Sequence, residues 1–184
     1  MKRVVLAFVL AACGGASEPP ATPAAPVAPA AASPNGGRLT VTRASFAGIA
    51  ADTPPTISGV AKALGSDFKV TTDLVTKKVV AKRGDGVTFE IVPSATGTKI
   101  ATVRTTSDAV EFPWETTVGM TLGSHRHWSK MTCKAGAADT AVCYADPKGA
   151  FQLEVNHTGV FPAKDAFTEK RIEALVWKPA GEQG

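Results

Sequence analysis

Short β-rich segments between residues 68 and 105 narrow the folds open to this chain more than any other feature. Turn-forming residues separate them, notably Gly84-Asp85-Gly86 and the stretch from residue 93 to 97. Strands joined by such short turns pair with their chain neighbours in antiparallel orientation. The segment therefore predicts an antiparallel meander over Phe68–Thr71, Val75–Ala81, Val87–Val92 and Thr98–Thr105.

The third of these strands indicates which face is buried. Its apolar residues Val87, Phe89 and Ile91 alternate with Thr88 and Glu90. Because successive side chains on a strand point to opposite faces, we expect the three apolar residues in the core and the other two in solvent.

Two elements are expected before the meander. An opening strand is predicted over Leu39–Ile49. Apolar residues then recur at helical spacing from Ile57 to Leu64, which predicts a short helix. We expect Thr53 to cap its start, Pro54-Pro55 to form its first turn and Gly65 to end it.

The second half of the domain adds further elements. A short helix capped by Thr121 is expected over Leu122–Lys130, and a strand over Phe151–Val155. The last element, Arg171–Lys178, is apolar on both faces, which is typical of a central or covered strand. The predicted class is α+β: a single small domain, predominantly an antiparallel β-sheet meander with one or two short packing helices.

The first residues have the layout of a secretory signal. Lys2 and Arg3 precede the apolar run Val4–Leu10, which is shorter than the roughly 20 residues of a membrane-spanning helix. The following Ala11-Ala12-Cys13 completes a resemblance to the lipobox of bacterial lipoproteins. This resemblance implies cleavage before Cys13 and attachment of lipid to its sulfur. The alternative is a buried strand with a core thiol.

We therefore expect four parts along the chain. Residues 1–12 are the signal peptide, 13–37 the lipidated Cys13 and a Pro/Ala-rich tether, 38–180 the folded domain and 181–184 a disordered tail. The tether has too few large apolar residues to offset its ordering entropy, whether it acts as a spacer or as a passive linker. Gly14 replaces the aspartate that retains lipoproteins in the inner membrane. We expect the outer membrane, with the domain facing the periplasm.

The basic composition does not indicate a nucleic-acid partner. The formal charge of +4 includes Lys2 and Arg3, and without them eighteen basic side chains oppose sixteen acidic ones, about +2. Basic clusters interleaved with aromatic residues are missing from the sequence. We expect no nucleic acid among the partners.

Cysteine usage predicts a disulfide. If Cys13 carries lipid, Cys133 and Cys143 are the other two of the three cysteines, and an oxidising compartment favours their pairing. A redox-active or metal-binding pair is the alternative, but the spacing is not C-x-x-C.

His125-Arg126-His127 is the most suggestive local cluster. On a strand the two histidines would share a face and could bind a metal with a third ligand such as His157 or Asp108. On the expected helix they diverge and form a polar face, with Leu122 and other apolar residues inward. We favour the helix and expect no metal site and no cofactor.

Catalytic motifs are missing from the sequence, which has no G-x-S-x-G, Walker loop or H-E-x-x-H. Gly84-Asp85-Gly86 is expected as a hairpin turn rather than a phosphate cradle. Aromatic residues next to proline, Trp114 and Phe161, either pack in the core or offer a ligand platform, and core packing is favoured. We expect no catalytic residues and no enzymatic activity.

Several short motifs occur in an order that is similar to one family. They are the lipobox, Ala63-Leu64-Gly65, Asp67-Phe68-Lys69-Val70, Arg83-Gly84-Asp85-Gly86-Val87, Gly119-Met120-Thr121-Leu122, the Cys133/Cys143 pair and Ile172-Glu173-Ala174-Leu175-Val176-Trp177. This combination resembles the RpoE-regulated lipoproteins, small envelope lipoproteins of unknown function. The resemblance covers about residues 39–178 and implies no catalytic residues.

The expected function is that of a membrane-anchored envelope lipoprotein. We expect a non-catalytic module that binds another envelope protein or a cell-wall component, or that supports envelope integrity. A periplasmic carrier of a small ligand or a metal is the alternative.

Overall fold

The structure is a computed structural model that describes residues 37–137 and 139–179. The expected signal peptide, the lipidation at Cys13, nearly all of the tether and the C-terminal tail lie outside the described residues. The first half contains β1 (Leu39–Thr40), β2 (Ser45–Phe46), β3 (Ile49–Ala50), α1 (Ile57–Leu64), β4 (Phe68–Thr72), β5 (Val79–Arg83), β6 (Thr88–Pro93), β7 (Ile100–Thr105) and β8 (Val110–Glu111). The second half contains the 3-10 turns η1 (Pro113–Glu115), η2 (Leu122–Ser124), η3 (Trp128–Lys130) and η4 (Lys164–Phe167), and the strands β9 (Thr132–Ala135), β10 (Thr140–Tyr144), β11 (Phe151–Asn156) and β12 (Ile172–Trp177).

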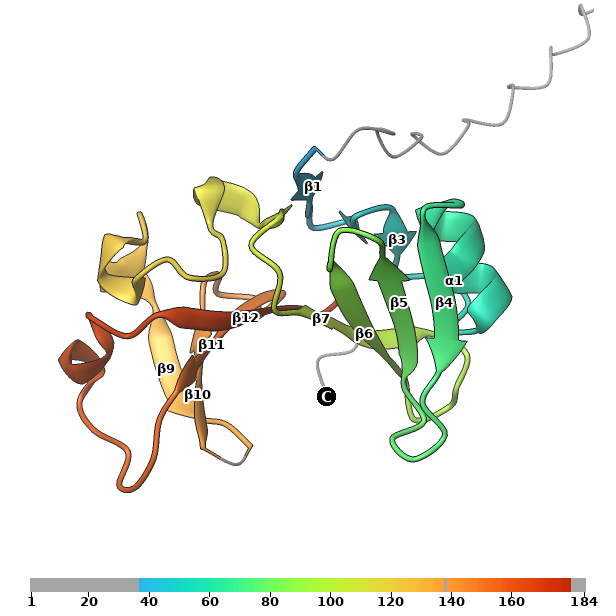
Figure 1. Cartoon of the computed structure of the whole chain (residues 1–184). Helices are drawn as coiled ribbons and strands as arrows, with labels where there is room; N and C mark the ends of the chain where they lie inside the picture. The colour runs from blue at the N-terminus through green and yellow to red at the C-terminus, as the bar shows by residue number, and fades with distance from the viewer. Residues whose placement is uncertain (1–36, 138, 180–184) are drawn as a thin grey trace, which may run out of the picture.

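One antiparallel sheet of eight strands dominates the domain, in the order β4-β5-β6-β7-β12-β11-β10-β9. It consists of two meanders, β4 to β7 and β9 to β12, joined where β12 pairs with β7 (Figure 1). The predicted α+β class, with a predominantly antiparallel sheet and a short helix, is confirmed.

The predicted side-chain alternation in β6 is confirmed. Phe89 and Ile91 are fully buried and Val87 is 1 % exposed. Glu90 faces the other side, where its carboxylate forms ion pairs with Lys78 (2.9 Å) and Arg104 (3.9 Å). Charged side chains therefore occupy the open face of the sheet, as period-2 patterning requires.

The last strand, β12, is central. It lies between β7 and β11, and Ala174, Leu175, Val176 and Trp177 are all buried. Side chains on both faces of such a strand are buried, which favours apolar residues at successive positions. The apolar run therefore predicted the central position of β12 correctly.

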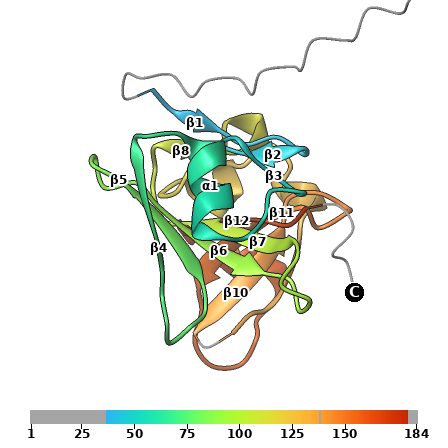
Figure 2. The same ribbon diagram turned by 90° about the vertical axis from the view of Figure 1, so that its right-hand side faces the viewer.

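The helix α1 forms where expected but begins differently. Its N-cap is Thr56, whose Oγ1 accepts a hydrogen bond from the Gly59 N–H (3.1 Å), so the predicted cap at Thr53 is wrong. Pro54-Pro55 lie before the helix rather than in its first turn. A Cβ at Gly59 would collide with the Pro54 carbonyl oxygen, so the turn packs against the helix only because this position is glycine. The helix covers the sheet near β4 and β5 (Figure 2).

Two expected strands are shorter or broken. Leu39–Ile49 is not one strand but β1, β2 and β3, because Ala47 and Gly48 both have positive φ and turn β2 back onto β3. The strand expected over Val75–Ala81 begins only at Val79. Before it, the Asp73 carboxylate accepts hydrogen bonds from two backbone N–H groups and forms a turn.

The helix expected over Leu122–Lys130 does not form. Two separate 3-10 turns, η2 and η3, replace it, and the backbone of His125 between them is extended. A Cβ at Gly123 would collide with Thr168, so the chain is held here by packing against residues near η4 rather than by helix propensity.

The core contains a continuous series of aromatic side chains, which we call the aromatic row. Neighbouring ring centroids lie 5.1 to 6.0 Å apart along Phe68, Phe89, Phe46, Phe112, Phe151 and Trp114. Its last member, Trp114, is half-buried and lines the pocket described below. The core and the candidate site are therefore in direct contact.

Candidate functional site

A pocket of about 730 Å³ lies where β9, β10, the turn after β10, η1 and the loop after β1 meet. Positive charge dominates its lining. The lining contains a single acidic residue, Asp146, and five basic residues; the five are Arg43, Lys130, Lys134, Lys148 and Lys178. Aromatic groups complete the wall: Trp114, Tyr144 and His127.

The hairpin β9–β10 carries one side of the pocket. Lys134 on β9 places its ammonium group 5.6 Å from the centre of the Tyr144 ring on β10, a cation–π contact. The neighbouring residues Cys133 and Cys143 stand directly opposite each other in the two strands and are joined by a disulfide. Cys143 is fully buried, so the disulfide fastens the edge strand β9 from the core side of the pocket wall.

A tight loop in η1 carries another part of the wall. Phe112 and Thr116 pair across it, and the backbone N–H of each bonds the carbonyl oxygen of the other. Between them Trp114 and Glu115 both have positive φ, 67° and 60°. Two consecutive non-glycine residues in this region are strained, and packing of the indole against the aromatic row holds them there.

Glu115→Gly should raise the free energy of unfolding by about 0.5–1 kcal/mol. Glycine adopts this backbone region without the Cβ penalty, and this gain exceeds the additional entropy that glycine loses on folding. Urea denaturation measures the change. Glu173→Gly is the matched control: Glu173 is also exposed but lies in β12, so the same substitution should destabilise. Equal effects at the two positions would contradict the strain at Glu115.

The two histidines singled out by the sequence lie against Trp114. Their rings are 6.0 Å (His125) and 5.1 Å (His127) from the indole and 6.1 Å from each other. The expected exposed polar face is wrong for His125, which is 3 % exposed, although Leu122 is buried as predicted. The reason is the extended backbone between η2 and η3, which turns the His125 side chain inward.

His125 serves the structure as an uncharged group. Its Nδ1 accepts a hydrogen bond from the His127 backbone N–H (3.0 Å), which places the ring hydrogen on Nε2. Burial, and then the nearby charge of His127, lowers the pKa of His125 to about 4. At neutral pH it is therefore a neutral side chain that supports Trp114.

The other candidate metal ligands are not gathered around these histidines. Among residues 37–137 and 139–179, no group of three or more His, Cys, Asp and Glu side chains could hold a metal ion. His157 packs instead against Phe161 (5.3 Å) and Phe167 (5.5 Å). Phe167 is fully buried and Phe161 is half-buried. Phe161, the second aromatic residue next to a proline, therefore packs against the core, as expected.

Asp146 is a buried carboxylate at the pocket. Its side chain is 0 % exposed, and its Oδ1 accepts a hydrogen bond from the Phe151 backbone N–H (2.9 Å). The Oδ2 atom has no hydrogen-bond partner within the described part of the chain, and the Arg43 guanidinium is 3.9 Å away. An unsatisfied buried carboxylate oxygen is costly and therefore calls for an explanation.

Sequence reasoning missed most of this pocket. Arg43, Lys134, Tyr144 and Asp146 come from three separate parts of the chain, and none belongs to a recognisable motif. One local signal was present: Asp146-Pro147-Lys148-Gly149 has the composition of a tight turn, and the Gly149 N–H does bond the Asp146 carbonyl oxygen (3.0 Å).

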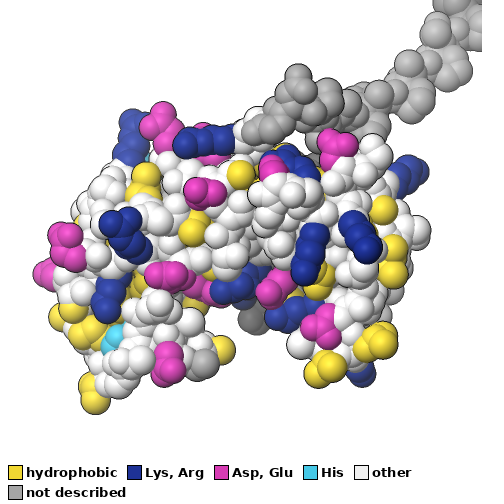
Figure 3. All heavy atoms as spheres, viewed as in Figure 1, with side chains coloured by type: hydrophobic (Ala, Val, Ile, Leu, Met, Phe, Trp, Pro, Cys, Tyr) yellow, Lys and Arg dark blue, Asp and Glu magenta, His cyan; other side chains and the backbone are white. Residues whose placement is uncertain are grey.

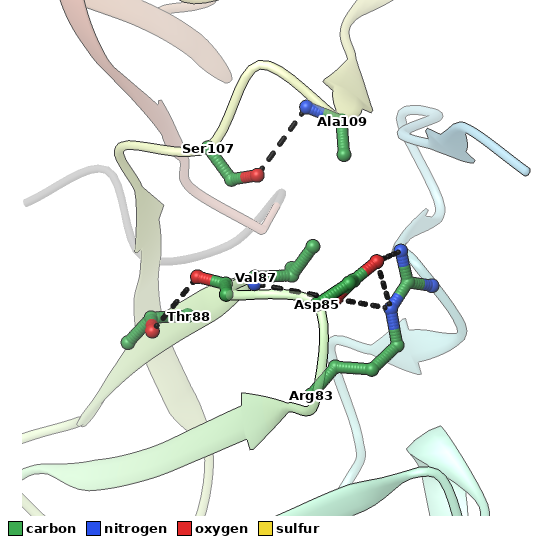
Figure 4. A network of polar contacts seen from close by, with 7 residues as sticks. Arg83, Asp85, Val87, Thr88, Ser107 and Ala109 are labelled. Atoms are coloured by element: carbon green, nitrogen blue, oxygen red, sulfur yellow. Dashed lines mark hydrogen bonds and ion pairs between the residues drawn. The ribbon is translucent and has the colours of Figure 1, made fainter. Parts of the chain in front are cut away.

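Gly84-Asp85-Gly86 is a hairpin turn between β5 and β6, as expected (Figure 4). The Asp85 carboxylate is bound by the Arg83 guanidinium (2.6 and 2.9 Å) and by the Val87 N–H (3.3 Å). This hydrogen bonding lowers the pKa of Asp85, and the carboxylate closes the turn rather than facing a ligand.

The remaining charges are mixed in sign over the face seen in Figure 3, where Lys and Arg side chains alternate with Asp and Glu. In contrast, five of the six Lys, Arg, Asp and Glu residues that line the pocket are basic. Within the described residues, no helix has the length and apolarity needed to cross a bilayer.

Comparison with known proteins supports the fold. No family model matches the chain, and no curated protein sequence matches it. Among solved structures, the crystal structure of the uncharacterized protein yfeY from Escherichia coli is similar, with a TM-score of 0.51 and 13 % sequence identity. The match covers 77 % of this chain and 99 % of that chain. At this identity the likeness concerns the fold alone.

Proposed function

We propose that this protein is a lipid-anchored lipoprotein of the bacterial envelope whose domain binds an anionic ligand without transforming it. The observation that carries the proposal is the pocket, whose lining contains five basic residues, the aromatic residues Trp114 and Tyr144, and one acidic residue. A pocket of this size with a few convergent polar groups is the usual form of a small-molecule site. Ammonium and guanidinium groups are the donors that proteins use for carboxylates and phosphates.

The lipobox at Cys13 supports the anchoring, and the tether would place the domain in the periplasm beside its membrane. The ordered motifs given above support membership of the RpoE-regulated lipoprotein family. The outer membrane is the proposed site because Gly14 follows the cysteine. The ligand would either be part of another envelope component or move freely in the periplasm. In the first case the domain is a binding module, and in the second it is a carrier; both would use the same pocket.

Removing pocket charge should weaken anion binding. For Lys134→Met/Lys178→Met we expect the Kd for citrate and pyrophosphate to rise at least about tenfold, since a hydrogen bond to a charged group is worth about 1.5–3 kcal/mol. Calorimetry on the lipidated protein in a neutral polyoxyethylene detergent provides the measurement, at fixed salt.

Lys62→Met/Lys69→Met is the matched control, because it removes the same charge from exposed positions on α1 and β4, outside the pocket. This control should leave the Kd within about twofold of the original value. Binding of neither anion, or an equal loss in both variants, would show that the pocket is not the site.

A further inference from the structure

The pocket contains one feature that a simple anion site does not need. Asp146 belongs to the lining, its side chain is buried, and its Oδ2 atom lies 3.9 Å from the Arg43 guanidinium with no hydrogen-bond partner in the described structure. An ionised carboxylate only accepts hydrogen bonds, and it repels another anion. A ligand that is held by the basic groups and also reaches Asp146 therefore needs a hydrogen-bond donor together with its own negative charge.

That donor is best supplied by a neutral hydroxyl group. An ammonium group would also satisfy Asp146, but it would lie beside Arg43, whose guanidinium is 3.9 Å from Oδ2, and among the pocket's lysines. Like charges this close disfavour a cationic donor. A hydroxyl carries no such cost.

The rest of the wall suits a hydroxylated ring. Trp114 and Tyr144 line the same pocket and are both half-buried, so part of each ring is open to a ligand. The C–H face of a sugar ring is apolar and packs on aromatic rings, while its hydroxyl groups point outward. Gln152, which is 7 % exposed, has its amide fixed by a hydrogen bond from Nε2 to the Gly149 carbonyl oxygen (3.1 Å), so its own carbonyl oxygen remains as a second acceptor.

Building on the proposed anion-binding function, we infer that the pocket is a site for an acidic saccharide. The basic side chains bind the carboxylate or phosphate, the two aromatic rings hold the sugar ring, and Asp146 accepts a hydrogen bond from a ring hydroxyl. Asp146 thereby selects hydroxylated anions over bare ones.

A ligand panel tests this inference on the lipidated protein by calorimetry in the same detergent. The probes are glucuronate and glucose 6-phosphate, cyclohexanecarboxylate as a ring anion without hydroxyls, and glucose as a neutral sugar. We expect at least one acidic sugar to bind ten times more tightly than both cyclohexanecarboxylate and glucose. The phosphate and carboxylate arms identify which acidic group is preferred, and either preference supports the inference.

Asp146→Asn supplies the second readout. Asparagine can still accept the hydrogen bond from the Phe151 N–H, but it turns the other oxygen into a donor. We expect the acidic sugar to lose about tenfold in affinity and cyclohexanecarboxylate to lose nothing, whereas the exposed control Asp108→Asn changes neither.

The outcomes separate the two proposals. Equal binding of all carboxylates, or equal weakening of both by Asp146→Asn, would overturn the saccharide inference and leave anion binding intact. If no anion in the panel binds, the anion-binding function falls with it.

Discussion

Replacing Phe46 with alanine should lower the free energy of unfolding by about 3–5 kcal/mol, as for other large buried aromatic residues. Phe46 is fully buried, and its ring lies 5.1 Å from Phe89, 6.0 Å from Phe112 and 6.4 Å from Trp177. It thus joins the short N-terminal hairpin to both meanders. The cavity left by its removal would lie at the centre of the aromatic row, where the surrounding rings cannot close it.

Urea denaturation followed by circular dichroism measures this loss. Leu74→Ala is the control, because Leu74 is a large apolar residue that is 87 % exposed, and its truncation should change stability by less than about 0.5 kcal/mol. If Phe46→Ala cost no more than Leu74→Ala, the aromatic row would not be the core of the domain.

Loss of the disulfide is expected to have the next largest effect, about 2–3 kcal/mol. Cys133 and Cys143 are 10 residues apart, and cross-linking a loop of this size removes that much chain entropy from the unfolded state. The measurement compares urea midpoints of Cys133→Ala/Cys143→Ala and the original protein. Reductant should destabilise the original protein and leave the double variant unchanged.

Thiol labelling gives the complementary readout. The denatured lipidated protein should contain no reactive thiol before reduction and two after it. Two thiols before reduction would contradict the disulfide. Since β9 is the edge strand of the sheet and, among the described residues, pairs with β10 alone, the double variant should also loosen the pocket wall that carries Lys134.

The parts of the fold that the sequence predicted well depend on local patterning. The alternation around Phe89 and the two-sided apolar run of β12 set burial directly, because each side chain's face follows from its position along the strand. The N-cap of α1 is predicted at Thr53 but lies at Thr56. The reason is that Pro54 and Pro55 form the segment before the helix rather than its first turn.

The candidate site was not predictable in the same way. Arg43, Trp114, Lys134 and Asp146 meet only because the second meander folds back beside η1 and the N-terminal loop. The sequence His125-Arg126-His127 offers a possible metal site, yet in the structure His125 is buried and packs against Trp114. Its burial depends on two 3-10 turns, and the first of them, η2, packs through Gly123 against Thr168, more than forty residues further along the chain.

The most direct test of anion binding in the pocket is a chemical-shift map. Two-dimensional NMR spectra of the protein, recorded at constant ionic strength without ligand, with glucuronate and with glucose 6-phosphate, report on each backbone N–H group and on the Trp114 indole. We expect shifts confined to the pocket, at Trp114, Lys134, Tyr144 and Gly149, with none on α1. Shifts spread over exposed lysines such as Lys62 and Lys69, or no shifts at all, would contradict a ligand site at this pocket.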